Sequence, residues 1–202
     1  MNSSPRDSDT DVQRRYFDSL VDVFAAEPPP DVAARLSRIV ELAQLAAGMR
    51  VLDVGSGAGA LLPFVLAHSP SRVVACDLSA EMLARAKERF PQVETNVGDV
   101  AGLELAASSF DVAFLNAVFP NITDKPAALT NLARLIAPGG RMVISHPEGR
   151  AFVLRLKDEL PFAIDPLPGE AELIRLLAPH PFRLERFVDE ANLYAAVARR
   201  MA

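Results

Sequence analysis

Residues 51–60 read VLDVGSGAGA, and this stretch decides the fold. A largely apolar segment, 51–54, leads into three glycines at alternate positions, Gly55, Gly57 and Gly59. A helical pattern begins directly after the last glycine. We interpret this order as a buried parallel strand, a tight turn whose backbone can approach a ligand, and a helix whose N-terminus faces the turn. The stretch therefore predicts a site for a ligand that carries a ribose.

The glycine pattern alone does not identify that ligand. Gly55, Gly57 and Ala60 also satisfy the dinucleotide-binding fingerprint, in which the last position can be alanine. Three glycines after a strand can also form only a tight turn. The residues downstream must separate these alternatives.

An acidic residue stands where a ribose-binding carboxylate is expected. Asp77 follows a second apolar run, 73–76, and lies eighteen residues after Gly59. A carboxylate at the tip of the second strand can accept two hydrogen bonds from a ribose diol. A helix N-cap is the alternative role, but Ser79 is better placed for it because an amphipathic helical pattern begins there.

Three further segments follow in order. Asp99 comes after a strand-like segment at 93–97, the run FDVAFLN occupies 110–116, and LIAPGG at 135–140 precedes another apolar run. Together with the glycine turn and the acidic residue after the second strand, they give five elements with a defined order and spacing. Over about residues 45–147 the sequence thereby resembles the class I S-adenosylmethionine-dependent methyltransferases.

The resemblance implies S-adenosylmethionine as the cofactor, and transfer of its methyl group to an O, N or S atom of a small molecule by in-line displacement. By the family's arrangement, Asp53 organises the turn and the cofactor's ammonium group, Asp77 takes the ribose hydroxyls, and Asp99 accepts from the adenine amino group. The implied cofactor-binding residues are Asp53, Gly55, Ser56, Gly57, Gly59, Asp77, Leu78, Met82, Asp99, Val100, Asn116 and Ala117. The main task of such a site is to hold two reactants in attack geometry.

Candidate residues for the methyl acceptor lie elsewhere. Tyr16 and Phe17 stand on an N-terminal helical pattern that could cover the cofactor, and Phe119 follows the predicted fourth strand. His146 ends the predicted fifth strand, at the edge where ligands bind in open α/β sheets. It could act as a general base near neutral pH, or it could only orient the following helix. No metal site is expected, because three scattered histidines and one cysteine lack ligand spacing.

Charge and composition limit the classes of partner. The 202 residues carry a net charge of −5, which argues against a nucleic-acid-binding protein. No apolar run is long enough for a membrane span, and the polar N-terminus does not resemble a signal peptide. Cys76, the single cysteine, lies in the predicted second strand and is interpreted as a buried apolar side chain. We expect a cytoplasmic protein without a nucleic-acid partner, and the sequence leaves monomer and homodimer open.

The patterns predict an α/β fold with a Rossmann-like, doubly wound sheet of about seven strands, mostly parallel with an antiparallel C-terminal hairpin. Strands are expected near 50–54, 72–76, 93–97, 110–115 and 140–146, and helices near 11–25, 31–47, 59–67, 79–90, 124–136 and 148–159. We expect a single domain, 1–202, divided into an N-terminal helical cap (1–47), a cofactor-binding core (48–147), a helical insertion that could be a lid (148–181) and a β-hairpin (182–202).

The predicted hairpin separates two enzyme classes. Residues 182–188 and 194–198 alternate between apolar and polar side chains and are joined by a short polar turn. A dinucleotide-dependent oxidoreductase usually continues with a parallel strand, whereas the methyltransferase family inserts an antiparallel one. An NAD(P)-dependent oxidoreductase is therefore the weaker alternative. A non-catalytic protein that binds S-adenosylmethionine is the other alternative.

Overall fold

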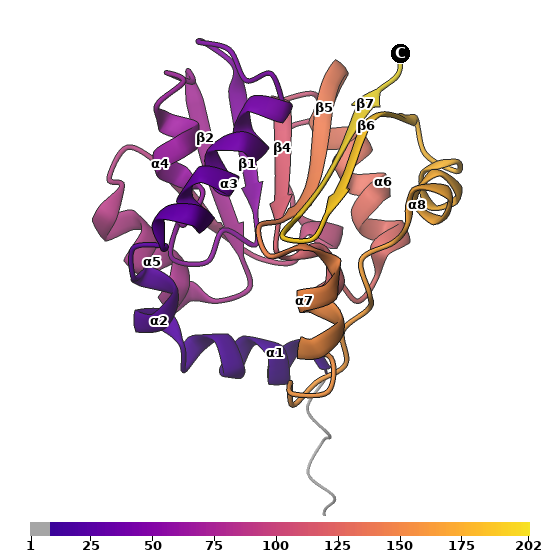
Figure 1. Ribbon diagram of the computed structural model, residues 1–202. Coiled ribbons are helices and arrows are strands. Elements are labelled where there is room, and N and C mark those ends of the chain that lie inside the picture. The colour runs from indigo at the N-terminus through magenta and orange to yellow at the C-terminus, as the bar shows by residue number, and fades with distance from the viewer. Residues whose placement is uncertain (1–8) are drawn as a thin grey trace, which may run out of the picture.

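A computed structural model describes residues 9–202, which contain a seven-stranded sheet in the order β3-β2-β1-β4-β5-β7-β6 (Figure 1). The strands are β1 (Arg50–Val54), β2 (Arg72–Asp77), β3 (Glu94–Val97), β4 (Phe110–Asn116), β5 (Ile136–His146), β6 (Phe182–Glu190) and β7 (Leu193–Arg200). The first five strands are parallel, β7 is antiparallel to β5, and β6 is antiparallel to β7. The predicted fold class is confirmed. The first eight residues of the predicted cap lie outside the described part of the chain.

Helices cover both faces of the sheet. They are α1 (Asp9–Asp18), α2 (Val21–Ala25), α3 (Pro30–Leu42), α4 (Leu62–Leu66), α5 (Ala80–Arg89), α6 (Lys125–Leu135), α7 (Gly149–Leu156) and α8 (Glu170–Leu177), with two 3-10 turns, η1 (Val100–Gly102) and η2 (Phe119–Asn121). Helices α3, α4 and α5 contribute to the core on one face, and α6 and α8 to the core on the other. In Figure 1, α1 and α7 lie across the lower edge of the sheet.

The residues of β1 explain why both faces need a cover. Leu52 and Val54 belong to the core beneath α6 and α8, whereas Val51 belongs to the core beneath α3, α4 and α5. Successive strand residues point to opposite faces, so an apolar run without polar alternation predicts a strand buried on both sides. All three of these side chains are buried.

The glycine turn lies at the point where the order of the sheet reverses. Val54, the last residue of β1, pairs with Cys76 of β2 on one side and with Leu115 of β4 on the other. In open α/β sheets, ligands bind outside the carboxyl ends of the strands at this switch point. In Figure 1 these strand ends face α1 and α2.

The N-terminal helical segment is interrupted, so the continuous helix predicted over 11–25 is wrong. After α1, Ser19 Oγ donates a hydrogen bond to the carbonyl of Tyr16 at 2.6 Å, and a short turn precedes α2. Helix α2 is then tied to α5 by an ion pair between Asp22 and Arg85, at 2.6 Å. The interruption lets the segment bend over the carboxyl edge of the sheet.

The second helix also differs from its prediction. It ends at Leu42 rather than at 47, and Gln44 just beyond it has a φ of 53°, which no α-helix continues. The helix begins at Pro30, one residue before its predicted start, so Asp31 lies in the first turn. There it pairs with Arg35, at 2.9 Å.

Two predicted boundaries around the core strands shift as well. Helix α4 is shorter than the predicted 59–67, because Gly59 still belongs to the turn, with a φ of 88°. Strand β5 begins at Ile136 rather than near 140, so Pro138-Gly139-Gly140 is an irregular part of the strand.

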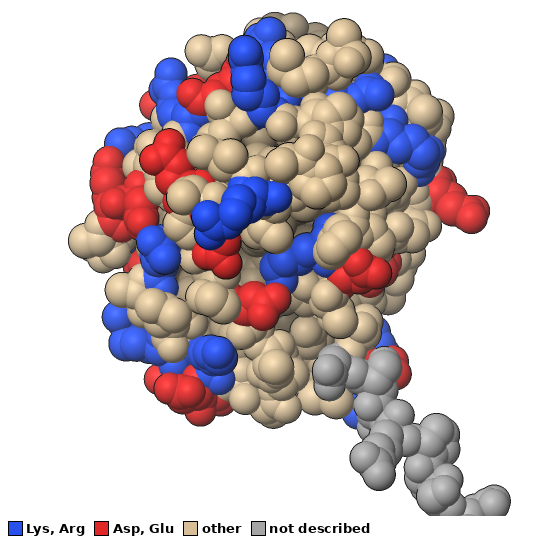
Figure 2. All heavy atoms as spheres, turned by 90° about the vertical axis from the view of Figure 1, so that its right-hand side faces the viewer, with Lys and Arg blue, Asp and Glu red and all other residues tan. Residues whose placement is uncertain are grey.

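Surface charge is mixed on the face at the right of Figure 1. Acidic and basic side chains are interspersed there (Figure 2). Within residues 9–202, no helix combines the length and the apolar character needed to cross a membrane.

Candidate functional site

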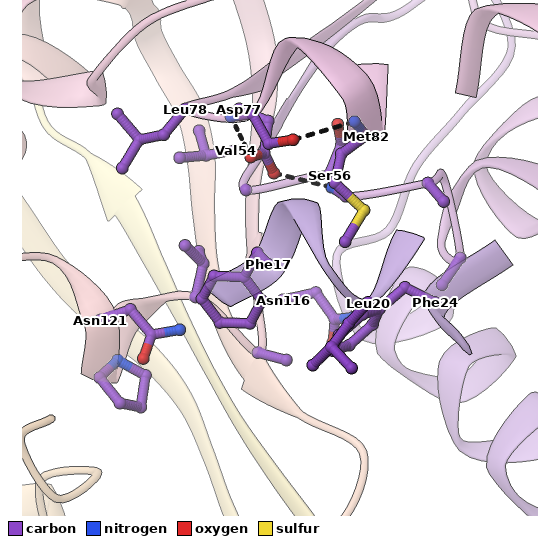
Figure 3. Close-up of a pocket in the computed structure, with 18 of the residues that line it drawn as sticks. Phe17, Leu20, Phe24, Val54, Ser56, Asp77, Leu78, Met82, Asn116 and Asn121 are labelled. Carbon is purple, nitrogen blue, oxygen red and sulfur yellow. Dashed lines mark hydrogen bonds between the residues drawn. The ribbon is translucent and has the colours of Figure 1, made fainter. Parts of the chain in front are cut away.

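A cavity of about 710 Å³ lies at the carboxyl edge of the sheet. Its inner wall consists of the glycine turn and the ends of β1, β2 and β4, and its outer wall includes α1, α2 and α7. Figure 3 shows Phe17, Leu20 and Phe24 of the N-terminal segment across the cavity from Asp77 and Leu78. This volume is typical of sites for small molecules and cofactors.

Two of the three glycines predicted to bind the cofactor line this cavity. Gly55 has a φ of 63°, and a Cβ at this position would overlap the side chain of Val118. Gly57 has a φ of 53° and also lines the wall. The structure does not bring Gly59 to the cavity. Glycine at this position instead lets the side chain of Leu62 pack against the turn, since a Cβ there would lie 2.9 Å from Leu62 Cδ1.

Asp77 holds the inner wall together. Its Oδ2 accepts the N–H of Gly57 and its Oδ1 accepts the N–H of Ser79, both at 2.9 Å. Ser79 is the N-cap of α5, as predicted, because its Oγ accepts the N–H of Met82 at 3.0 Å. Burial raises the pKa of Asp77, and the backbone donors oppose that rise.

Asp53 and Ser56 each place a buried polar atom without a hydrogen-bond partner in the cavity wall. Asp53 Oδ2 and Ser56 Oγ have no hydrogen-bond partner within the described part of the chain, and both residues line the cavity. Burial, reinforced by the charge of Asp77, raises the pKa of Asp53 to about 8. Buried polar groups without partners are rare and costly. This part of the wall is therefore suited to a polar ligand.

Four further residues that were predicted to bind the cofactor belong to the same cavity. Leu78, Met82, Asp99 and Val100 all line it. Asp99 is exposed, and its Oδ1 accepts the N–H of Ala101 at 2.9 Å, which caps η1. A carboxylate oxygen has more than one acceptor position, so this bond leaves capacity for a ligand.

The end of β4 forms the next part of the wall. Asn116 Oδ1 accepts the hydroxyl of Ser145 at 3.1 Å, and the N–H of Ala117 donates to the carbonyl of Ser145 at 2.7 Å. Ala117 has a φ of 58°, which is a strained value for alanine. Asn116 and Ala117 line the cavity, as expected from the sequence.

Phe119 is not where the sequence places it. The expectation that it faces the acceptor is wrong, because the chain turns into η2 and buries its ring in the core. Lys125 Nζ lies 5.4 Å from the centre of that ring. Val118 and Asn121 line the cavity instead. The sequence could not predict this, because a 3-10 turn of three residues is too short to show a periodic pattern of apolar residues.

His146 lines the cavity but is tied to the start of α7. Its Nδ1 accepts the N–H of Glu148 at 3.1 Å, and its ring contacts Phe152, with 5.4 Å between ring centres. Burial lowers the pKa of His146 to about 4. The neutral ring then carries its proton on Nε2, so it presents a donor rather than a base. These contacts favour the orienting role over the catalytic one.

Tyr16 and Phe17 form part of the outer wall. The ring centre of Phe162, from the predicted insertion 148–181, lies 5.5 Å from that of Tyr16 and 5.8 Å from that of Phe17. The N-terminal segment and the insertion therefore meet over the cavity. Sequence reasoning missed Gln13, a buried polar residue of α1 that also lines it.

No group of three His, Cys, Asp or Glu side chains is arranged for a metal ion among the described residues. Cys76 is buried, as expected, and burial raises the pKa of its thiol. A thiol with a raised pKa is a poor nucleophile.

Residues 52–144 match the family described as the methyltransferase domain. This range extends from β1 into β5 and includes the glycine turn, Asp77 and Asp99. The chain therefore contains a methyltransferase domain of the class I, S-adenosylmethionine-dependent type.

Two curated relatives illustrate the range of the similarity. Trans-aconitate 2-methyltransferase from Azoarcus sp. (strain BH72) is 37% identical over 147 residues, which are 67% of this chain and 58% of that protein. Demethylmenaquinone methyltransferase from Paenarthrobacter aurescens (strain TC1) is 35% identical over 113 residues, which are 54% of this chain and 44% of that protein. The chain thus spans about half the length of these relatives.

Solved structures show the same fold. An S-adenosylmethionine-dependent methyltransferase from Aquifex aeolicus superposes with a TM-score of 0.73 at 22% identity, over 91% of this chain and 98% of that one. The N-methyltransferase NodS from Bradyrhizobium japonicum WM9, in complex with S-adenosyl-L-homocysteine, gives 0.74 at 19% identity, over 94% and 99%. At these identities the likeness establishes the fold.

Proposed function

We propose that this chain binds S-adenosylmethionine in the cavity and transfers its methyl group to an O, N or S atom of a small molecule. The observation that carries the proposal is the pair of unpartnered buried atoms, Asp53 Oδ2 and Ser56 Oγ, beside a glycine turn at the switch point of the sheet. Leaving such atoms unpaired costs about 1–3 kcal/mol each, so a polar ligand that reaches them is stabilised.

The inner wall matches the parts of this cofactor in turn. Gly55 and Gly57 leave room for its amino-acid end, and the carboxyl group of Asp53 accepts from its ammonium group. Asp77 uses its remaining lone pairs for the ribose hydroxyls. Asp99 accepts from the adenine amino group.

The cofactor supplies an electrophilic methyl group on a sulfonium centre. The residues of the chain hold the acceptor atom in line with it, and such positioning lowers a barrier by several kcal/mol, up to about 7–11 in favourable intramolecular systems. Asn116 and Ala117 lie beside the glycine turn, where the two reactants meet. His146 positions the start of α7 and presents Nε2–H as a donor.

The outer wall selects the acceptor in this proposal. The aromatic contacts of Tyr16 and Phe17 with Phe162 support a cover made of the N-terminal segment and the insertion 148–181. The names of the two relatives point to small acceptors, trans-aconitate and demethylmenaquinone. A cytoplasmic location, the lack of a nucleic-acid partner and the oligomeric state stay predictions.

The function is tested by turnover. The protein is incubated with S-adenosylmethionine carrying a labelled methyl group and with pools of phenols, thiols, amines and carboxylates. Acceptor-dependent formation of S-adenosylhomocysteine and a labelled product supports the proposal. Cofactor binding without turnover in any pool favours the non-catalytic alternative instead.

A further inference from the structure

Apolar side chains form much of the cavity wall that faces away from the glycine turn. Phe17 and Leu20 of the N-terminal segment, Phe152 and Leu156 of α7, and Ile164 of the insertion contribute its walls. In Figure 3, Phe17 and Leu20 lie opposite the polar inner wall. Burying apolar surface is the dominant favourable contribution to binding at such a wall.

Few charged side chains lie on the acceptor side of the cavity. Five acidic residues line the described cavity, but the proposed function gives Asp53, Asp77 and Asp99 to the cofactor. Of the other two, Glu27 and Glu148, the latter is paired with Arg35 at 3.1 Å, and Arg14 is the single cationic residue of the described lining. Arg14 is already paired, with its Nη1 3.3 Å from Asp18 Oδ2. An anionic acceptor would therefore find no unpaired cationic side chain in the described wall.

Uncharged polar groups complete the acceptor side. Gln13, Asn121 and His146 line the cavity and offer amide or imidazole groups that can orient a single polar atom. A few placed polar groups in an apolar pocket determine orientation without requiring a charged ligand.

We infer that the acceptor is electrically neutral and largely apolar, with one nucleophilic heteroatom on a hydrophobic ring or chain. The inference rests on the proposed function and names the substrate class of the same site. Anionic acceptors are disfavoured, polycarboxylates such as trans-aconitate among them, because the single cationic residue of the described lining, Arg14, is already paired.

The test uses two probes that share one ring system and differ in charge. Binding of 2-naphthol, neutral at neutral pH, and of 2-naphthoate, an anion, is measured calorimetrically with and without saturating S-adenosylhomocysteine. This cofactor product lacks the sulfonium charge, so the comparison reports on the walls of the protein. We expect 2-naphthol to bind at least about tenfold more tightly than 2-naphthoate.

A matched pair of variants on α7 locates the effect. Leu156 lines the cavity, whereas Leu154 on the same helix is 52% exposed and does not. Leu156→Lys should strengthen 2-naphthoate binding and weaken 2-naphthol binding, and Leu154→Lys should change neither. If Leu156→Lys does not fold, Leu156→Ala should weaken 2-naphthol binding several-fold through the lost apolar contact, and Leu154→Ala should leave it unchanged.

Equal or tighter binding of 2-naphthoate to the unmodified protein would overturn the inference, as would failure of 2-naphthol to bind at all. Failure of S-adenosylhomocysteine to bind would instead overturn the proposed function. The measurement of 2-naphthol without cofactor keeps these two failures apart.

Discussion

Asp77 and Gly57 are joined by a hydrogen bond from the Gly57 N–H to Asp77 Oδ2, at 2.9 Å. The bond ties the end of β2 to the turn that follows β1. Because the other oxygen of Asp77 accepts the N–H of Ser79, one carboxylate positions both the glycine turn and the start of α5. The residue expected to bind ribose therefore also shapes the wall around it.

Asp77→Ala should weaken binding of S-adenosylmethionine by about 1–3 kcal/mol, because it removes a charged acceptor from the cofactor and from the turn. Asp111→Ala is the matched control. Asp111 also accepts a backbone N–H, that of Arg50 at 2.8 Å, but it does not line the cavity. Calorimetric titration of both variants measures the difference. Unchanged affinity in Asp77→Ala would contradict the ribose assignment.

Gly55→Ala should destabilise the protein by more than Gly48→Ala. Both glycines have a positive φ, 63° and 81°, so each alanine incurs backbone strain of about 1–2 kcal/mol. Only at Gly55 does the added Cβ also overlap Val118, whereas nothing lies within 4 Å at Gly48. Urea denaturation gives both free energies of unfolding. Equal losses would show that Val118 moves aside at no cost.

Asp53→Asn should remove a pH dependence of stability. The folded pKa of Asp53 is about 8 and the usual value is 3.8, so the folded state holds a proton that the unfolded state has lost between these values. The contribution of Asp53 to folding stability is therefore present at low pH and disappears as the pH rises toward 8. The variant should therefore gain stability relative to the unmodified protein, by on the order of a few kcal/mol, between about pH 5 and about pH 8. The free energy of unfolding of both proteins is measured by urea denaturation across this pH range. The same pH dependence in both would show that the pKa of Asp53 is not raised.

His146→Asn should change stability in the opposite pH direction. The folded pKa is about 4 and the usual value 6.5, so the unfolded state binds the proton more readily. The contribution of the neutral ring is complete above about pH 6.5 and is lost as the pH falls toward 4.

Asparagine keeps an acceptor near the position of Nδ1, so the variant should retain most of the contact with Glu148 while losing this acid sensitivity. His180→Asn, which does not line the cavity, is the control. Denaturation at several pH values measures the effect. A variant as acid-sensitive as the unmodified protein would show that His146 is not the group responsible.

The glycine turn and the strands around it were predictable because their signals are local. Apolar runs ending in Gly55 and Asp77 specify buried strands, a turn and the carboxyl edge of a sheet without reference to distant residues. The N-cap at Ser79 was predictable for the same reason, since it depends only on the residues that follow it.

The outer wall was harder to predict because it depends on contacts between distant segments. Phe17 and Phe162 are brought together only by the fold. Phe119 is buried in the core and Val118 lines the cavity in its place, because packing against the core sets the orientation of a short 3-10 turn. The unpartnered atoms of Asp53 and Ser56 likewise follow from burial, which a sequence pattern does not reveal.

Calorimetric titration with S-adenosylmethionine and S-adenosylhomocysteine, with NADH and NADPH as controls, tests the central claim most directly. The account predicts saturable binding of the first two ligands, weakened in Asp77→Ala, and no binding of the nicotinamide cofactors. Binding of NADH or NADPH in place of S-adenosylmethionine would contradict the account and make the glycine turn a dinucleotide site.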